Sequence, residues 1–146
     1  MTIHARLLTI LLVEDSRSDA VLIQETLSES KFLNELHIVR DGVEATDFLY
    51  KTGKYANAPR PDIILLDLNL PKKNGRELLA QIKADEKLMT IPVVVLTTSS
   101  DEVDILKSYQ LRVNCYLVKP VELEQFVDVV QSIERFWLAF VELPPE

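Results

Sequence analysis

The sequence predicts a doubly wound α/β domain, a (βα)5 sandwich built on a five-stranded parallel sheet. Four short apolar runs rich in β-branched residues predict strands at residues 7–13, 63–66, 93–96 and 115–118, and a weaker run predicts one at residues 36–39. Continuous apolar runs of this length are typical of strands that helices cover on both faces. Stretches with helical periodicity separate the runs, so strand and helix alternate five times, with right-handed crossovers.

Helical spacing of apolar residues marks the five helical segments in chain order. Residues three and four positions apart share one face of a helix, so these side chains are expected to pack on the sheet. The five sets are Ala20, Ile23 and Leu27; Val43, Thr46, Leu49 and Tyr50; Leu78, Leu79 and Ile82; Val103, Leu106 and Tyr109; and Leu123, Phe126, Val130 and Ile133.

Polar and glycine-containing positions predict where elements begin and end. Ser16, with Asp19 three residues on, is typical of the cap of a helix that begins there. The pair Asp41-Gly42 predicts a turn that ends the second strand. Residues 52–62 contain one glycine and two prolines, and we expect an exposed loop that is longer than most connections of its kind.

Composition bounds the class of protein. The chain has 146 residues with a formal net charge of −7, a length that suits one domain over residues 1–146, with residues 136–146 as a C-terminal extension. One cysteine excludes a disulfide framework, and three glycines exclude a Gly-rich dinucleotide loop or a Walker-type phosphate loop. The acidic balance argues against direct nucleic-acid binding. No secretion signal or membrane span is evident, so we expect a soluble, cytoplasmic protein.

Acidic residues follow two of the predicted strands. Glu14 and Asp15 come after the apolar run 9–13, and Asp67 comes after the run 63–66. If these runs are neighbouring parallel strands, the carboxylates converge at the end of the sheet where ligands bind. At about 5 Å and an effective dielectric of about 20, each pair repels by roughly 3 kcal/mol, which a raised pKa or a bound cation would offset. Oxygen ligands suit Mg²⁺. The alternative is that Asp15 only caps a helix and Asp67 only ends a strand.

Two further polar residues follow strands in the same way. Thr97 comes after the run 93–96, and Lys119 comes after the run 115–118. A lysine ammonium can neutralise a phosphoryl oxygen, and a threonine hydroxyl can donate a hydrogen bond to another. Taken singly, each residue is more often an ordinary solvated charge or strand former, but together with the carboxylates they predict a functional site.

Four sequence blocks, in this order, resemble the conserved blocks of response-regulator receiver domains. They are residues 11–15 (LLVED), 65–71 (LLDLNLP), 96–98 (LTT) and 117–120 (LVKP). The resemblance covers residues 7–135 and implies a CheY-like fold with the strand order 2-1-3-4-5. Two departures are mild, because Glu14 stands where aspartate is commoner and Thr98 stands where a smaller residue is usual.

The resemblance implies a role for each residue of the site. Asp67 would accept a phosphoryl group from a phosphohistidine of a histidine kinase. Asp15 and Asp67 would bind Mg²⁺ directly, Glu14 would bind it through water, and the backbone carbonyl of Asn69 would complete the protein ligands. Lys119 would pair with the phosphoryl group.

The same resemblance implies a conformational switch. Thr97 would hydrogen-bond the phosphoryl group once it forms, and Tyr116 would turn inward as Thr97 moves. The Lys119-Pro120 peptide bond would be cis. The protein would then signal through changed protein contacts and would not turn over an external substrate.

The end of the sequence indicates a protein interface. Residues 132–141 are unusually apolar for a surface helix, and Val129, Phe136 and Leu143 recur every seven residues. We expect a homodimer, with an extended helix that covers its own core as the alternative. Segments 55–61, 93–96, 114–116 and 136–138 resemble the small response regulators of cyanobacterial phytochromes, which would make the partner a light-sensing histidine kinase.

Three other functions compete with this interpretation. A phosphatase of the haloacid dehalogenase type also uses an aspartyl nucleophile with Mg²⁺, but Asn69 stands where its second carboxylate would be. A flavodoxin needs hydroxyls and amides in its first loop, whereas Glu14 and Asp15 would repel the flavin phosphate. A phosphorylation-independent scaffold with the receiver fold is disfavoured because every needed side chain is present.

Overall fold

The computed structural model describes residues 7–30, 33–68, 70, 74–98 and 115–140, with the backbone alone of Cys115 and of residues 133–140. Five parallel strands form one sheet in the order β2-β1-β3-β4-β5, which confirms the predicted fold class. The strands are β1 (Leu8–Val13), β2 (Asn34–Val39), β3 (Ile63–Asp67), β4 (Val93–Thr97) and β5 (Cys115–Val118). All five lie within a residue or two of the predicted apolar runs.

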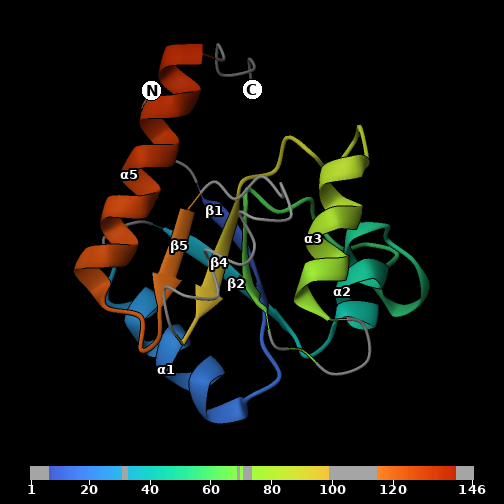
Figure 1. Ribbon diagram of the computed structural model, residues 1–146, viewed down its shortest axis with the longest axis horizontal. Coiled ribbons are helices and arrows are strands. Elements are labelled where there is room, and N and C mark those ends of the chain that lie inside the picture. Colours follow the sequence, from blue (N-terminus) through green and yellow to red (C-terminus); the bar gives the residue numbers. More distant parts are fainter. Residues whose placement is uncertain (1–6, 31–32, 69, 71–73, 99–114, 141–146) are drawn as a thin grey trace.

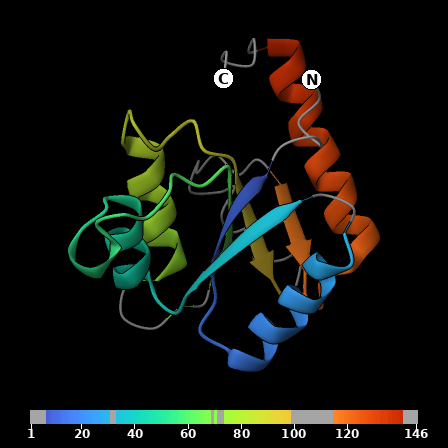
Figure 2. The same cartoon turned by 180° about the vertical axis from the view of Figure 1, so that it is seen from behind.

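Helices cover both faces of this sheet. The described helices are α1 (Arg17–Ser28), α2 (Gly42–Leu49), the short 3-10 helix η2 (Gly53–Tyr55), α3 (Gly75–Ala84) and α5 (Leu123–Phe140). Figures 1 and 2 show α1 and α5 on one face and α2 and α3 on the other, with the far end of α5 rising past the sheet. The helix predicted around Val103 to Tyr109 lies outside the described residues.

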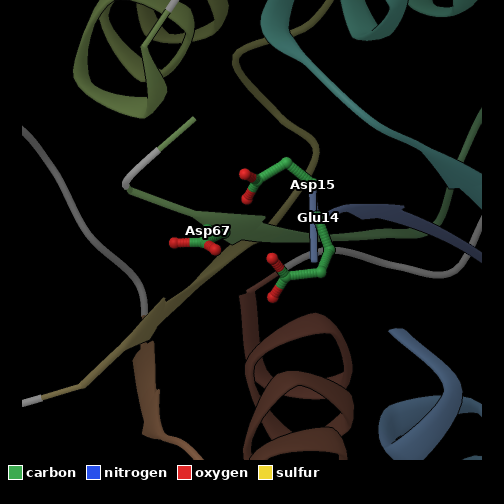
Figure 3. A group of neighbouring side chains, drawn as sticks. All are labelled: Glu14, Asp15 and Asp67. Carbon is green, nitrogen blue, oxygen red and sulfur yellow. The ribbon is translucent and has the colours of Figure 1, made fainter. Parts of the chain in front are cut away.

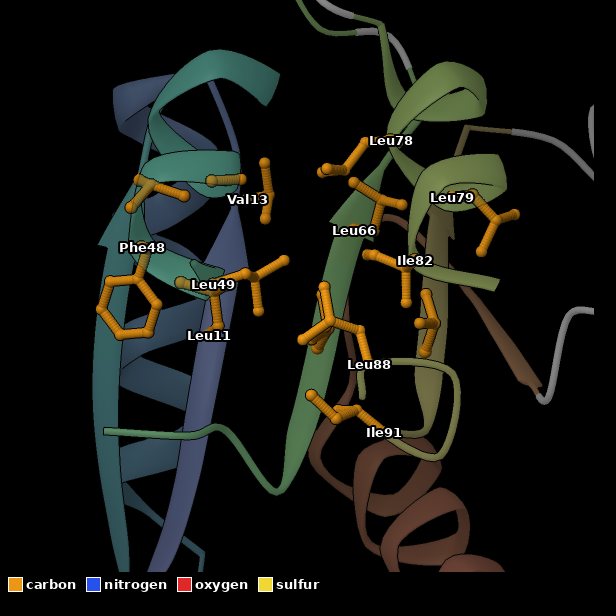
Figure 4. Close-up of a cluster of buried hydrophobic side chains, with 14 of the residues drawn as sticks. Leu11, Val13, Phe48, Leu49, Leu66, Leu78, Leu79, Ile82, Leu88 and Ile91 are labelled. Atoms are coloured by element: carbon orange, nitrogen blue, oxygen red, sulfur yellow. The ribbon is translucent and has the colours of Figure 1, made fainter. Parts of the chain in front are cut away.

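Alternate residues of the central strands supply two separate apolar cores. Leu11 and Val13 of β1 face α2 and α3, whereas Ile10 and Leu12 face α1 and α5. Successive side chains of a strand point to opposite faces, so a strand covered on both sides is apolar throughout, as the continuous runs predicted. Figure 4 shows the core beneath α2 and α3, where Leu66 of β3 also points.

The predicted core faces of the helices are confirmed in α1 and α3 and only in part in α2. In α2, Leu49 is buried as predicted, but Val43 and Tyr50, which we expected to pack on the sheet, are 48% and 41% exposed. The other buried residues of α2 are Gly42, Ala45 and Phe48. The helix has eight residues, and Tyr50 is already its C-cap, where the chain leaves the helical face. In α5, Phe126 and Val130 are buried as predicted, and Leu123 is half-buried.

Side-chain caps begin both helices that follow β1 and β2. The Ser16 hydroxyl accepts a hydrogen bond from the Asp19 backbone N–H at 3.3 Å, as the sequence predicted. The turn predicted at Asp41-Gly42 is wrong. Asp41 is instead the N-cap of α2, where its carboxylate accepts from the Glu44 N–H at 2.8 Å, and Gly42 is the first helical residue. An aspartate in extended conformation satisfies an N–H that would otherwise be unpaired at a helix start, which explains why this pair opens a helix.

The loop over residues 52–62 is mostly exposed, as predicted, but part of it packs against the core. Tyr55 and Ala58 pack against the core, and the Tyr55 ring meets Phe48 edge-on at a centroid distance of 5.3 Å. Arg60 donates to the Lys87 carbonyl at 2.5 Å and to the Thr90 hydroxyl at 2.9 Å. The long connection therefore forms a packed cover over α2.

Among the described residues, no helix has both the length and the apolar character that crossing a membrane requires.

Candidate functional site

Three carboxylates meet at the carboxyl ends of β1 and β3. Glu14 and Asp15 follow β1 directly, Asp67 is the last residue of β3, and the two strands are hydrogen-bonded neighbours. One carboxylate oxygen from each residue lies within 4.8 Å of the other two. Figure 3 shows the three side chains around one shared space. The structure thus brings together the residues that the sequence placed at strand ends.

Burial differs sharply among these carboxylates. Glu14 is 1% exposed and Asp67 is 5% exposed, whereas Asp15 is open to solvent. Burial, followed by the hydrogen bond and charge of Asp67, raises the pKa of Glu14 to about 7, although Lys119 and the Ser16 N–H act in the opposite direction. Like charges held together out of water favour a proton or a cation at the site.

Lys119 supplies a positive charge inside the cluster. Its ammonium lies 2.5 Å from Glu14 Oε1 and donates to Asp67 Oδ2 at 2.8 Å and to Asp19 Oδ2 at 3.0 Å. Burial alone would lower the pKa of Lys119, but the hydrogen bonds to Asp67, Glu14 and Asp19 outweigh it and hold the pKa above its usual value. Lys119 therefore stays charged, and the Lys119-Pro120 peptide bond is cis, as the resemblance implied.

Thr97 lies on β4, the neighbour of β3, and Tyr116 lies on β5, the next strand outward. Thr97 ends β4 and is buried, and its carbonyl accepts from the Lys119 N–H at 2.8 Å, which ties the two strand ends together. The Tyr116 ring on β5 is 42% exposed and thus faces outward. Asn69, the expected carbonyl ligand, lies outside the described residues.

Two residues that contact this site escaped the sequence analysis. Asp19 was seen only as part of a helix cap, because its partner Lys119 is 100 residues away. Gly75 lies against the end of β3, where its N–H donates to the Leu68 carbonyl at 3.1 Å and an added Cβ would lie 2.5 Å from the Asp67 carbonyl oxygen. A glycine one residue after a helix cap, in a chain with so few glycines, was the available signal for Gly75.

The donor set fits a hard divalent cation. Carboxylate oxygens from Glu14, Asp15 and Asp67 are the kind of ligand that Mg²⁺ and Mn²⁺ accept, and one of the three is open to solvent. The chemistry of the site is therefore that of a small acidic pocket with one fixed lysine, which can hold a cation and an anion side by side.

Comparison with known proteins identifies the family. The sequence-family model of the response regulator receiver domain matches residues 10–131. The chain belongs to this family. It is 57% identical over 135 residues to the response regulator Rcp1 of Synechocystis sp., an alignment that covers 92% of each chain.

Solved receiver structures agree with this assignment. The Mn²⁺-bound form of Rcp1 has 56% sequence identity and a TM-score of 0.72, over 94% of this chain and 99% of that one. The phosphorylated cyanobacterial phytochrome response regulator RcpA has 54% identity and a TM-score of 0.75, over 96% of this receiver and all of that chain. This receiver is thus a response regulator related to those of phytochromes, and neither the flavodoxin nor the phosphatase family is its own.

Proposed function

We propose that this receiver accepts a phosphoryl group from a histidine kinase onto Asp67, with Mg²⁺, and signals through changed protein contacts. The contact of Lys119 with Asp67 carries the proposal, because it fixes a cation where the charge of an incoming phosphoryl group develops. Phosphoryl transfer depends mainly on positioning and charge neutralisation, and this cluster is built for both.

The transfer itself makes one bond and breaks one. A carboxylate oxygen of Asp67 bonds to phosphorus as the bond from phosphorus to the donor nitrogen breaks, and that nitrogen keeps the electron pair and takes a proton. Asp15 and Asp67 would hold Mg²⁺ directly, with Glu14 through water and the Asn69 carbonyl as the remaining ligands. When bound, Mg²⁺ supplies charge neutralisation for the phosphoryl oxygens. Lys119 orients Asp67 before transfer and pairs with the phosphoryl group after it.

Thr97 and Tyr116 connect the acceptor to the surface in this proposal. Thr97 ends the strand next to β3 and directly follows Leu96, which is the register partner of Asp67, and the new phosphoryl group would draw the Thr97 hydroxyl toward it. Tyr116 on the neighbouring strand would then turn from its outward position. The added negative charge is the local event, and a changed protein-binding surface is the result.

We also propose the partners. The relationship to Rcp1 and to a cyanobacterial phytochrome response regulator supports a phytochrome histidine kinase as the donor. The apolar stretch at 132–141 supports a homodimer, and the formal charge of −7 supports output through protein contacts and not through nucleic acid. No external phosphomonoester would be turned over, and the protein would act as one cytoplasmic receiver domain.

Phosphorylation by phosphoramidate with and without Mg²⁺, followed by sizing chromatography, tests the proposal. We expect stoichiometric labelling with Mg²⁺ and little with EDTA, together with elution as a dimer. Beryllofluoride should form an adduct under the same conditions, and its failure to do so would favour the phosphorylation-independent scaffold. Steady hydrolysis of a phosphomonoester would favour the phosphatase.

A phytochrome histidine kinase supplies the separate test of the partner. Phosphotransfer should label the wild-type receiver and leave Asp67→Asn unlabelled. Transfer from unrelated histidine kinases at an equal rate would contradict a phytochrome partner while leaving the acceptor role of Asp67 intact.

A further inference from the structure

Three carboxylates share the Lys119 ammonium, and one of them belongs to neither the acceptor nor the predicted metal ligands. The Lys119 ammonium donates hydrogen bonds to Asp67 and Asp19 and forms an ion pair with Glu14. A phosphoryl oxygen that approaches Lys119 must therefore compete with these three carboxylates. The structure therefore raises the question of which carboxylate leaves.

The three carboxylates differ in how much free energy it would cost to move each one away from Lys119. The Glu14 side chain is fully buried and that of Asp67 is 7% exposed, so moving either away from Lys119 would leave a carboxylate charge less well compensated away from water. The Asp19 side chain is 37% exposed, and its contact with Lys119, at 3.0 Å, is the longest of the three. Asp19 also lies in the first turn of α1, where the helix dipole stabilises a carboxylate without any partner. Asp19 is thus the acceptor that can leave.

Asp19 also lines a hollow beside Lys119. A cavity of about 250 Å³ is bounded by Asp19, Leu22, Ile23, Thr98, Lys119, Pro120 and Val121. Lys119 and Asp19 thus meet at a solvent-reachable edge of the site and not behind it. An anion that approaches Lys119 from this side meets the negative charge of Asp19.

We propose that Asp19 occupies the position on Lys119 that a phosphoryl oxygen takes, so that it competes with the phosphoryl donor until transfer occurs. This inference rests on the proposed acceptor role of Asp67. Asp19 is a positioning residue here, since it acts through Lys119 and forms no bond to the transferred group. Its competition slows phosphorylation by small donors and leaves Lys119 fully paired while the protein is unphosphorylated.

The side chain of Asp19 can be changed without removing the helix cap. The capping bond to Ser16 uses the Asp19 backbone N–H, which Asp19→Asn retains. Glu25→Gln is a matched control, because Glu25 is an exposed carboxylate on the same helix two turns further on and away from Lys119. Both variants remove one negative charge, and only the charge of Asp19 faces Lys119.

The experiment measures the initial rate of phosphorylation by subsaturating phosphoramidate, at saturating Mg²⁺ and low ionic strength. Removal of one partly screened charge beside the anion should raise the rate about three- to tenfold in Asp19→Asn and by less than about twofold in Glu25→Gln. Added salt should shrink the difference, since the side chain is partly exposed. A helix-stability role for Asp19 would change the unfolding midpoint and not this salt dependence.

Each outcome bears on a separate claim. If the wild type is not labelled, the proposed function fails. If the wild type is labelled and Asp19→Asn reacts at the same rate or more slowly, the competition by Asp19 is overturned and the acceptor role of Asp67 stands. An equal acceleration in Glu25→Gln also overturns it, because net charge alone would then explain the effect.

Discussion

Two polar regions of the molecule lie against the core. They are the site at the end of β1 and β3 and the cover formed by residues 52–62 over α2, and their polar groups are arranged in opposite ways. At the site, three carboxylates lie within 4.8 Å of one another, and two of them, Glu14 and Asp67, share Lys119. In the cover, polar groups pair with partners of complementary character, as where the Tyr55 hydroxyl donates to Glu44 at 2.8 Å and Arg60 donates to the Lys87 carbonyl.

The site is therefore a region where like charges repel one another, whereas the cover is a region whose contacts stabilise the fold. Like charges at the site favour whatever cation or group reduces their repulsion, which makes the site responsive to metal and phosphoryl binding. The cover contains no such cluster of carboxylates, since Asp62 is its one acidic residue, and Tyr55 joins Phe48 in an edge-on contact. Variants at the site should therefore change phosphorylation, whereas variants in the cover should change stability alone.

The largest effect should come from Lys119→Met. Removing this cation leaves Glu14 and Asp67 as buried carboxylates without their shared partner, which should cost about 3 kcal/mol of unfolding free energy without metal and abolish labelling by phosphoramidate. Urea unfolding with EDTA and with Mg²⁺ measures the cost, and Mg²⁺ should restore part of it. Lys87→Met, at an exposed lysine, is the control, and an equal loss in both variants would contradict the account.

Gly75→Ala should be the next most damaging change. The new methyl group would lie 2.5 Å from the Asp67 carbonyl oxygen and 2.6 Å from Leu68 Cα, so the end of β3 or the start of α3 must move. We expect a loss of about 2 kcal/mol and slower phosphorylation, because the backbone that carries the acceptor shifts.

Gly53→Ala provides the comparison for Gly75. Gly53 has φ of +58° but nothing within 4 Å of an added Cβ, so only backbone strain of about 1 kcal/mol applies and phosphorylation should not change. Equal phosphorylation rates in the two variants would show that the position of β3 is insensitive to α3.

A smaller effect is expected for Tyr55→Phe in the cover. The variant keeps the ring against Phe48 and removes the hydroxyl that donates to Glu44 in a half-buried setting, which should cost about 1 kcal/mol. Thermal unfolding measures this loss. The phosphoramidate labelling rate should equal that of the wild type, and a slower rate would mean that the cover and the site are coupled.

The smallest effect should be a gain in the free energy of unfolding. Lys51 has φ of 57° and follows the C-cap of α2, where its N–H donates to Phe48 and the Thr52 N–H donates to Asp47 in a Schellman arrangement. Lys51→Gly should therefore stabilise the protein by about 0.5 kcal/mol in urea unfolding. Lys51→Ala keeps the Cβ and should give no gain, so equal stabilisation by both variants would exclude backbone strain as the cause.

Local patterns in the sequence predicted most of the fold. Continuous runs such as residues 63–66 indicated strands buried on both faces, and Ser16 indicated the start of α1. The face of α2 was predicted wrongly at Tyr50, which shares the helical spacing with the buried Leu49 yet serves as a C-cap, where its hydroxyl donates to Asp85. Spacing alone does not reveal where a helix ends.

The site also contains features that the sequence predicted and features that it did not. Glu14, Asp15 and Asp67 could be predicted because each follows a recognisable strand, and strand ends meet at one edge of a parallel sheet. The contact of Asp19 with Lys119 could not be, because it joins the first turn of α1 to the end of β5 across 100 residues. Burial of Glu14 was also hidden, since it depends on how neighbouring elements pack.

The most direct test of the central claim is to identify the residue that becomes phosphorylated. After reaction with phosphoramidate and Mg²⁺, borohydride reduces an aspartyl phosphate to homoserine, and peptide mass spectrometry locates the change. We predict homoserine at position 67 in the wild type and at no position in Asp67→Asn. Homoserine at another aspartate of the wild type, or an unmodified Asp67 in a protein that carries the label, would contradict the account.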